Sequence, residues 1–104
     1  MSALGEEFSA LDALLDEHAQ LETRMSDPEV LSSPKLLKQV SRRYAELSRI
    51  KAAADQLEHA QGDLEAAREL AEDDSSFAEE IPALEEAERI AHEHLLSILA
   101  PRDP

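Results

Sequence analysis

The fold is decided by residues 34–72, PKLLKQVSRRYAELSRIKAAADQLEHAQGDLEAARELAE. Apolar residues recur there every three or four positions, the spacing of one face of an α-helix. They are Leu37, Val40, Tyr44, Leu47, Ile50, Ala54, Leu57, Leu64, Ala67 and Leu70. After Pro34 the segment contains no proline, so it predicts a helical run over most of its length.

This run is long compared with the helix expected before it. A straight helix over 34–72 would measure ~58 Å, whereas a helix over residues 3–26 would measure ~36 Å. A partner so much longer than its neighbour would leave an end unpacked. We therefore expect a bend or break near Ser48, whose side chain could cap a new turn, and Gly62 is the second candidate.

A first amphipathic helix is expected from about residue 3 to residue 26. Its apolar stripe consists of Leu4, Phe8, Leu11, Leu15, His18 and Leu21, widened by Leu14 and Met25. Pro28 ends it, because the residue before a proline is pushed out of the α region. Ser33 is then the expected N-cap of the long run, with Pro34 at its first helical position.

The acidic segment 72–76 is expected to be a loop, followed by a last helix from about Phe77 to Leu99. Its apolar positions are Ile81, Leu84, Ala87, Ile90, Ala91, Leu95, Ile98 and Leu99. Pro82 fits this helix if the helix proper begins near Ile81.

Composition points to the same fold class. The 104 residues are 42% apolar, but only three are aromatic and only two are glycine. A β-rich fold of this length would need more tight turns than two glycines supply. The sequence predicts an all-α fold, an antiparallel helical bundle of three to four amphipathic helices, in one domain over residues 1–100.

The last residues, 101–104, read Pro-Arg-Asp-Pro. Two prolines in four residues are typical of a semi-rigid interdomain linker. We expect this segment to begin a linker to further domains, and the alternative is a complete protein with a Pro-rich end.

Several protein classes are disfavoured. The chain has no cysteine, so disulfides and thiolate chemistry are excluded. No basic signal-peptide start and no membrane-length apolar run occur in the sequence, so a cytoplasmic protein without membrane contact is expected. The net charge of −14 argues against duplex DNA as a partner.

No catalytic, cofactor-binding or metal-binding residue is expected. Carboxylates are spread over helix surfaces without a histidine or lysine to orient them. The four histidines (His18, His59, His92 and His94) include no pair at i, i+4, so a helical metal motif is absent. His18 lies in the apolar stripe of the first helix and is interpreted as a core-edge residue.

One short segment reverses the charge of the chain. Residues 35–51 contain six of the ten basic residues and a single acid, Glu46, which gives +5 against −7 before and −12 after. On a helical wheel, four of the cations share a strip of about 60° opposite the apolar face. These residues, called the cationic strip below, are Lys35, Lys38, Arg42 and Arg49. Arg43 lies at the edge of the packed face, where an internal salt bridge is expected.

Two interpretations of the cationic strip remain open. It is either a docking surface for RNA phosphates or an acidic protein, or a means of neutralising the acidic first and last helices. Three or four cations would provide contact and orientation rather than sequence readout.

Four segments resemble a known family in order and spacing over nearly the whole chain. They are SDPEV (26–30), RYAELS (43–48), DLEAAREL (63–70) and LAPRDP (99–104). Together they resemble the N-terminal domain of the bacterial peptide chain release factor 1 family. The chain departs from the family pattern in a shorter acidic loop at 73–76 and in Ala100.

The resemblance implies an accessory domain of a class-I release factor. Such factors recognise the stop codons UAA and UAG on the ribosome and trigger hydrolysis of peptidyl-tRNA. Their N-terminal helical domain reaches the stalk base, where ribosomal RNA and protein lie, and takes part in the interplay with the GTPase release factor. The Gly-Gly-Gln loop and the codon-reading tripeptide are absent here, so no enzymatic activity is expected of this chain.

The alternative is a coiled-coil oligomerisation or adaptor protein without a ribosomal role. Two short runs of apolar residues at heptad spacing suggest it, Leu57-Leu64-Ala71 and Leu84-Ala91-Ile98. The heptads are short and interrupted, so a long coiled coil is disfavoured. We expect a monomer, and sedimentation distinguishes the two.

Overall fold

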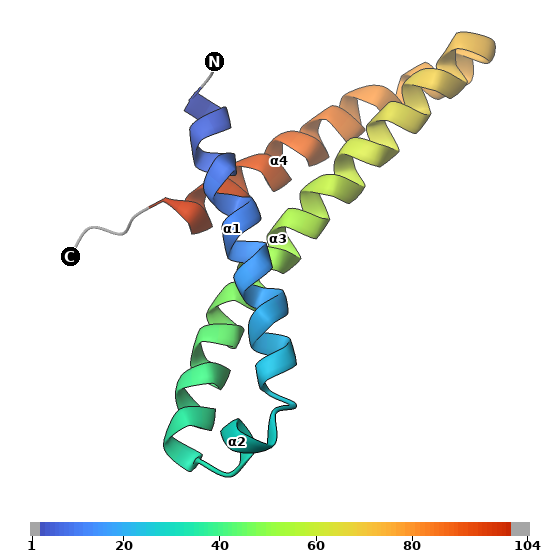
Figure 1. Ribbon diagram of the computed structural model, residues 1–104. Helices are drawn as coiled ribbons and strands as arrows, with labels where there is room; N and C mark the ends of the chain where they lie inside the picture. The colour runs from blue at the N-terminus through green and yellow to red at the C-terminus, as the bar shows by residue number, and fades with distance from the viewer. Residues whose placement is uncertain (1–2, 101–104) are drawn as a thin grey trace. The chain divides into compact units, whose positions relative to one another are not determined.

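The computed structural model describes residues 3–100, with the side chains of Phe8 and of residues 10–100. Four α-helices occur in this part of the chain: α1 (Ala3–Arg24), α2 (Pro28–Leu31), α3 (Pro34–Asp73) and α4 (Ile81–Leu99). A 3-10 segment, η1 (Ser75–Glu80), precedes α4 (Figure 1). No strand occurs within residues 3–100, so the predicted all-α class is confirmed. The expected linker, 101–104, lies outside the described residues.

The chain divides into two compact units between Lys51 and Ala52, inside α3. The first unit contains α1, α2 and the first half of α3, and the second contains the second half of α3, η1 and α4. In each unit the two long segments run antiparallel (Figure 1).

The core of the first unit consists of large aliphatic side chains. Leu21, Val30, Val40 and Leu47 form a buried cluster, and Leu47 is only 1% exposed. Partly buried apolar residues pack against it: Leu14, Met25, Leu36, Leu37, Tyr44 and Ile50. The stripes predicted on the two helices therefore meet each other, as their helical spacing requires.

Two side-chain caps shape the connection from α1 to α3. Asp27 accepts a hydrogen bond from the Glu29 backbone N–H at 2.9 Å, which starts the one-turn helix α2 at Pro28. The Ser33 hydroxyl accepts from the Leu36 backbone N–H at 3.3 Å, so the predicted cap before Pro34 is confirmed. α2 was not predicted from the sequence, and it inserts Val30 into the core.

His18 is buried at the interface of α1 and α3. Its ring stacks on Tyr44 with centroids 4.5 Å apart, and its Nε2 lies 3.0 Å from the Ser48 hydroxyl. Ser48 already donates its hydroxyl hydrogen to the Tyr44 carbonyl at 2.8 Å. Because a hydroxyl carries one proton, His18 must donate to Ser48 through Nε2. The expected core-edge position of His18 is confirmed.

Of the bend or break expected near Ser48 or Gly62, the break is wrong, because α3 is one uninterrupted helix of 40 residues. The Ser48 hydroxyl bonds back to Tyr44 within the helix and also meets His18, so it does not cap a new turn. Gly62 keeps a negative φ, and a Cβ there would meet nothing within 4 Å. The premise was also wrong, since each half of α3 has its own antiparallel partner, α1 or α4.

The second unit is buried with smaller side chains. Its buried residues are Ala53, Leu57, Leu64 and Ala67 on α3 and Ala91 and Leu95 on α4. Arg68 and Glu85 connect the two helices by an exposed ion pair of 3.1 Å. Such exposed pairs contribute about 0–1 kcal/mol.

The connection between α3 and α4 is shorter than expected. The loop predicted over 72–76 is wrong, because α3 continues to Asp73 and η1 starts at Ser75. Asp74 makes this possible by accepting from the Ser76 backbone N–H at 3.0 Å and from its hydroxyl at 2.8 Å, bonds that lower the pKa of its carboxyl. The start of the last helix expected at about Phe77 is wrong, because residues 75–80 form η1; α4 begins at Ile81, the start with which Pro82 was expected to fit.

Candidate functional site

The cationic strip lies on one face of α3 in the first unit. Lys35, Arg42 and Arg49 are seven residues apart and Lys38 falls between the first two, so all four share a face along ~21 Å of helix. All four side chains are exposed. Because α3 is unbroken from Pro34 past Arg49, the whole strip lies on a single helix.

The strip is directed away from the core by the position of the buried residues. Val40 and Leu47, also seven residues apart, are 3% and 1% exposed and hold the opposite side of α3 in the core. The predicted opposition of apolar and basic faces is therefore confirmed in the first unit. The burial of one face of the helix leaves the basic side chains of the opposite face in solvent.

Within the described residues, none of the four strip cations forms an ion pair or side-chain hydrogen bond. The interpretation that they neutralise the acidic helices receives no support from these contacts. Their charge is available to another molecule.

Arg43 does serve inside the fold, as predicted. Its Nε and Nη2 donate to the two carboxylate oxygens of Glu17 on α1 at 2.7 and 2.9 Å, a bidentate pair. Its Nη1 also lies 3.4 Å from Glu46. These bonds lower the pKa of the Glu17 carboxyl and raise that of the Arg43 guanidinium. Arg43 thereby also binds the only acid among residues 35–51.

A shallow hollow of about 290 Å³ lies at the middle of the strip. Lys38 and Arg42, one turn apart, line it together with Gln39, Arg43 and Glu46. Two ammonium or guanidinium groups beside an amide can hold a phosphate or carboxylate by charge-assisted hydrogen bonds. The hollow contains no histidine or second carboxylate for acid–base chemistry.

A metal site and a membrane-spanning helix each have requirements that can be compared with the described residues. No group of three histidine, aspartate or glutamate residues among them is placed to hold a metal ion. None of the helices in the described part of the chain has both the length and the apolar character to cross a membrane.

Comparison with known proteins agrees with the resemblance seen in the sequence. Residues 14–104 match the family model described as the PCRF domain. The chain belongs to the PCRF domain family. Peptide chain release factor 1 of Leifsonia xyli is 50% identical over 97 residues, and that of Renibacterium salmoninarum is 47% identical over 97 residues. Each alignment covers 93% of this chain and 27% of the relative.

The predicted resemblance to bacterial release factor 1 is therefore confirmed. The PCRF domain chain spans about 27% of the length of the curated relatives it matches. No solved structure matches it.

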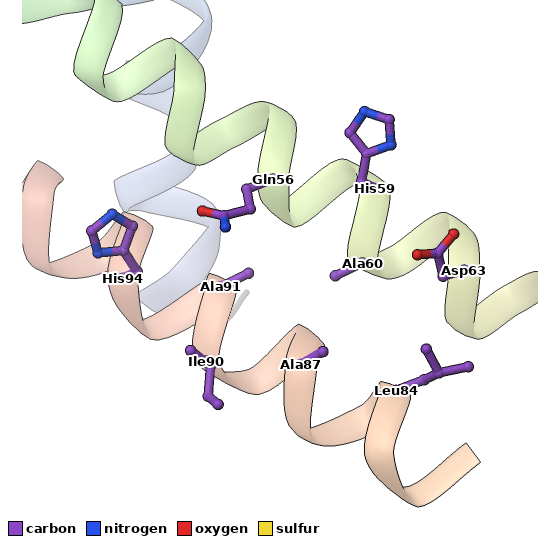
Figure 2. A pocket seen from close by; sticks show the side chains of 9 residues that line it. All are labelled: Gln56, His59, Ala60, Asp63, Leu84, Ala87, Ile90, Ala91 and His94. Carbon is purple, nitrogen blue, oxygen red and sulfur yellow. The ribbon is translucent and has the colours of Figure 1, made fainter. Parts of the chain in front are cut away.

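Sequence reasoning missed a second surface feature of this PCRF domain chain. A groove of about 670 Å³ lies between α3 and α4 within the second unit. Figure 2 shows its lining residues: Gln56, His59, Ala60, Asp63, Leu84, Ala87, Ile90, Ala91 and His94. The available signal was the alanines at Ala60, Ala87 and Ala91. Whether these alanines lie opposite each other depends on how the two helices align, and the residue pattern of one helix does not predict that alignment.

Proposed function

We propose that this chain is an accessory, positioning domain of a translation termination factor that directs release of the nascent peptide at UAA and UAG codons. It contacts the ribosome through Lys35, Lys38, Arg42 and Arg49, near the stalk base. The membership of the PCRF domain family and the similarity to release factor 1 support this proposal. The observation that carries it is the exposed cationic strip with no ion pair among the described residues.

In this proposal residues 1–100 act as one N-terminal domain of a cytoplasmic factor, and residues 101–104 begin the linker to the codon-recognition and hydrolysis domains. The sequence contains no Gly-Gly-Gln segment, so hydrolysis belongs to those other domains. The domain's contribution is contact and orientation, including the functional interplay with the GTPase release factor.

The charge pattern favours ribosomal RNA phosphates as the direct contact of the strip. The chain as a whole is strongly acidic, so approach to RNA is favourable only where the local charge is positive. Four aligned cations neutralise a few phosphates and fix orientation without reading bases. Ribosomal protein at the stalk base would meet the same surface.

Charge reversal in a full-length factor that carries this domain tests the proposal. Lys38→Glu with Arg42→Glu should weaken ribosome binding, and the salt dependence of log K should decrease in slope by about 2, one per lost phosphate contact. The matched control is Arg24→Glu with Arg68→Glu, which changes the net charge equally at exposed positions outside the strip. Equal behaviour of the two variants, in affinity and in salt slope, would remove the docking role.

The oligomerisation alternative is disfavoured by burial. Leu57 and Leu64 belong to the first run at heptad spacing, and both are buried within the single chain, with exposed fractions of 6% and 3%. A coiled-coil seam needs such residues on the surface of the single chain. Sedimentation at micromolar concentration should show a monomer, and an obligate dimer would favour the alternative.

A further inference from the structure

The α3–α4 groove of the second unit is apolar at its base because its residues there are small. Ala60, Ala87 and Ala91 face the space between the two helices in Figure 2. Methyl side chains are too short to fill the space between two helices, whereas longer residues of the same unit, such as Leu57 and Leu95, are buried. The groove therefore has room for side chains of another molecule.

Large apolar side chains beside the groove remain exposed. Ile90 lines it and is 54% exposed, although isoleucine is among the residues most often buried. Leu70 is 49% exposed, seven residues after Asp63 and thus on the same face of α3. Leu84 and Ile90 therefore give the groove aliphatic lining on α4, and Leu70 is a further exposed aliphatic side chain on α3.

The edges of the groove are acidic. Asp63 lines it, and a neighbouring hollow that shares His59 and Asp63 is also lined by Asp55 and Glu58. On α4, Glu86 and Glu93 lie one turn before and after Ile90 and share a single cation, Arg89. Residues 52–100 contain fourteen acids and two arginines.

This charge selects among possible occupants. A second copy of the chain would bring the same net charge of −14 into contact with the groove, which disfavours self-association. An uncharged apolar ligand would gain nothing from the acidic edges. A basic partner with aliphatic residues satisfies both features.

The dimensions fit a helix. The α4 side of the groove extends from Leu84 to His94, ~15 Å or about three turns. Residues at i, i+4 and i+7 of an amphipathic helix span ~11 Å and are the usual anchors in a groove of this kind.

We propose that the α3–α4 groove binds a basic amphipathic helix of a partner protein. Its aliphatic face packs over Ala60, Ala87 and Ile90, and its lysine or arginine side chains meet Asp63 and the acids of α4. This surface is separate from the cationic strip, and the inference does not depend on the ribosomal role proposed for that strip.

Binding of synthetic peptides to the 104-residue chain tests the inference. The probe is a fluorescent helical peptide with leucines at i, i+4 and i+7 and lysines elsewhere on its surface, measured by anisotropy. A second peptide carries glutamate in place of every lysine. We expect the lysine peptide to bind and the glutamate peptide to bind at least tenfold more weakly, since it faces like charge.

Two variants locate the binding surface. Ile90→Ser should weaken binding of the lysine peptide about tenfold or more, the loss expected when one aliphatic side chain is no longer buried. Leu31→Ser is the matched control, because Leu31 is likewise 54% exposed but lies in the first unit. Asp63→Asn should weaken binding about two- to fivefold, against no change for the exposed Asp12→Asn.

Circular dichroism of each variant checks that its helices are intact. Equal weakening by Ile90→Ser and Leu31→Ser would overturn the inference, because binding would then be nonspecific attraction to an acidic protein. Dimerisation that Ile90→Ser abolishes, or tight binding of the glutamate peptide, would overturn it as well, by showing a different occupant.

Discussion

The two halves of α3 belong to one helix but are buried by different kinds of side chain. Among the residues whose burial the structure describes, the four buried apolar residues of the first unit are leucines and valines, whereas three of the six in the second unit are alanines. The first half exposes a cationic strip behind a filled core, and the second half exposes acids beside an open groove. Side-chain volume at the buried positions therefore determines where the surface is closed and where it remains open to a ligand.

The prediction with the largest expected effect truncates one buried leucine in each unit to alanine. Leu47 and Leu95 are both 1% exposed. Leu47→Ala should lower the free energy of unfolding by about 3–5 kcal/mol and Leu95→Ala by about 2–3 kcal/mol, within the range for buried leucines. The smaller loss is expected where neighbouring alanines provide fewer contacts. Urea unfolding followed by circular dichroism measures both, and a larger loss for Leu95→Ala would reverse the comparison.

A smaller test compares exposed positions on the two halves of α3. Gly62→Ala should stabilise the chain by about 0.5–1 kcal/mol, because alanine has the higher helix propensity and open space surrounds the position. The mirror change in the first half, Ala45→Gly, should destabilise it by a similar amount. Thermal unfolding gives both values. Destabilisation by Gly62→Ala would mean that the helix requires glycine there.

The smallest expected effect distinguishes the two interhelical ion pairs. Because bonding to Arg43 lowers the folded-state pKa of Glu17, the pair stabilises the first unit above the unfolded pKa of about 4.3. This contribution is lost as the pH falls through the lower, folded-state pKa. Glu17→Gln should therefore flatten the decline in stability below about pH 4.3.

The control for that change is Glu85→Gln in the second unit. Glu85 accepts one hydrogen bond from Arg68, whereas Glu17 accepts two from Arg43. We expect the decline of the free energy of unfolding at acidic pH to change more for Glu17→Gln than for Glu85→Gln. Equal slopes for both variants would show that the bidentate geometry adds nothing.

Features encoded by neighbouring residues were predictable from the sequence. Ser33 with Pro34 predicted the start of α3, and Pro82 was expected to fit a last helix that begins near Ile81. The position of Arg43 at the edge of the apolar face predicted its internal ion pair. Each inference needed only helical geometry and the chemistry of one side chain.

Features that depend on distant residues were not predictable. Ser48 has the character of a cap, and what keeps it inside the helix is Tyr44 together with His18, thirty residues away. The acids around Asp74 suggested a loop, but one carboxylate with two bonds to Ser76 shortened it to a single residue. The groove required Ala60 and Ala87, on different helices, to meet.

The stacking of Tyr44 on His18 gives this chain a built-in optical reporter. Tyr44 is the only tyrosine and the chain has no tryptophan, so its near-ultraviolet fluorescence comes from the first unit. Far-ultraviolet dichroism, by contrast, records the helices of both units. Following the two signals during one denaturant titration separates the unfolding of the leucine-rich half from that of the alanine-rich half without any introduced label.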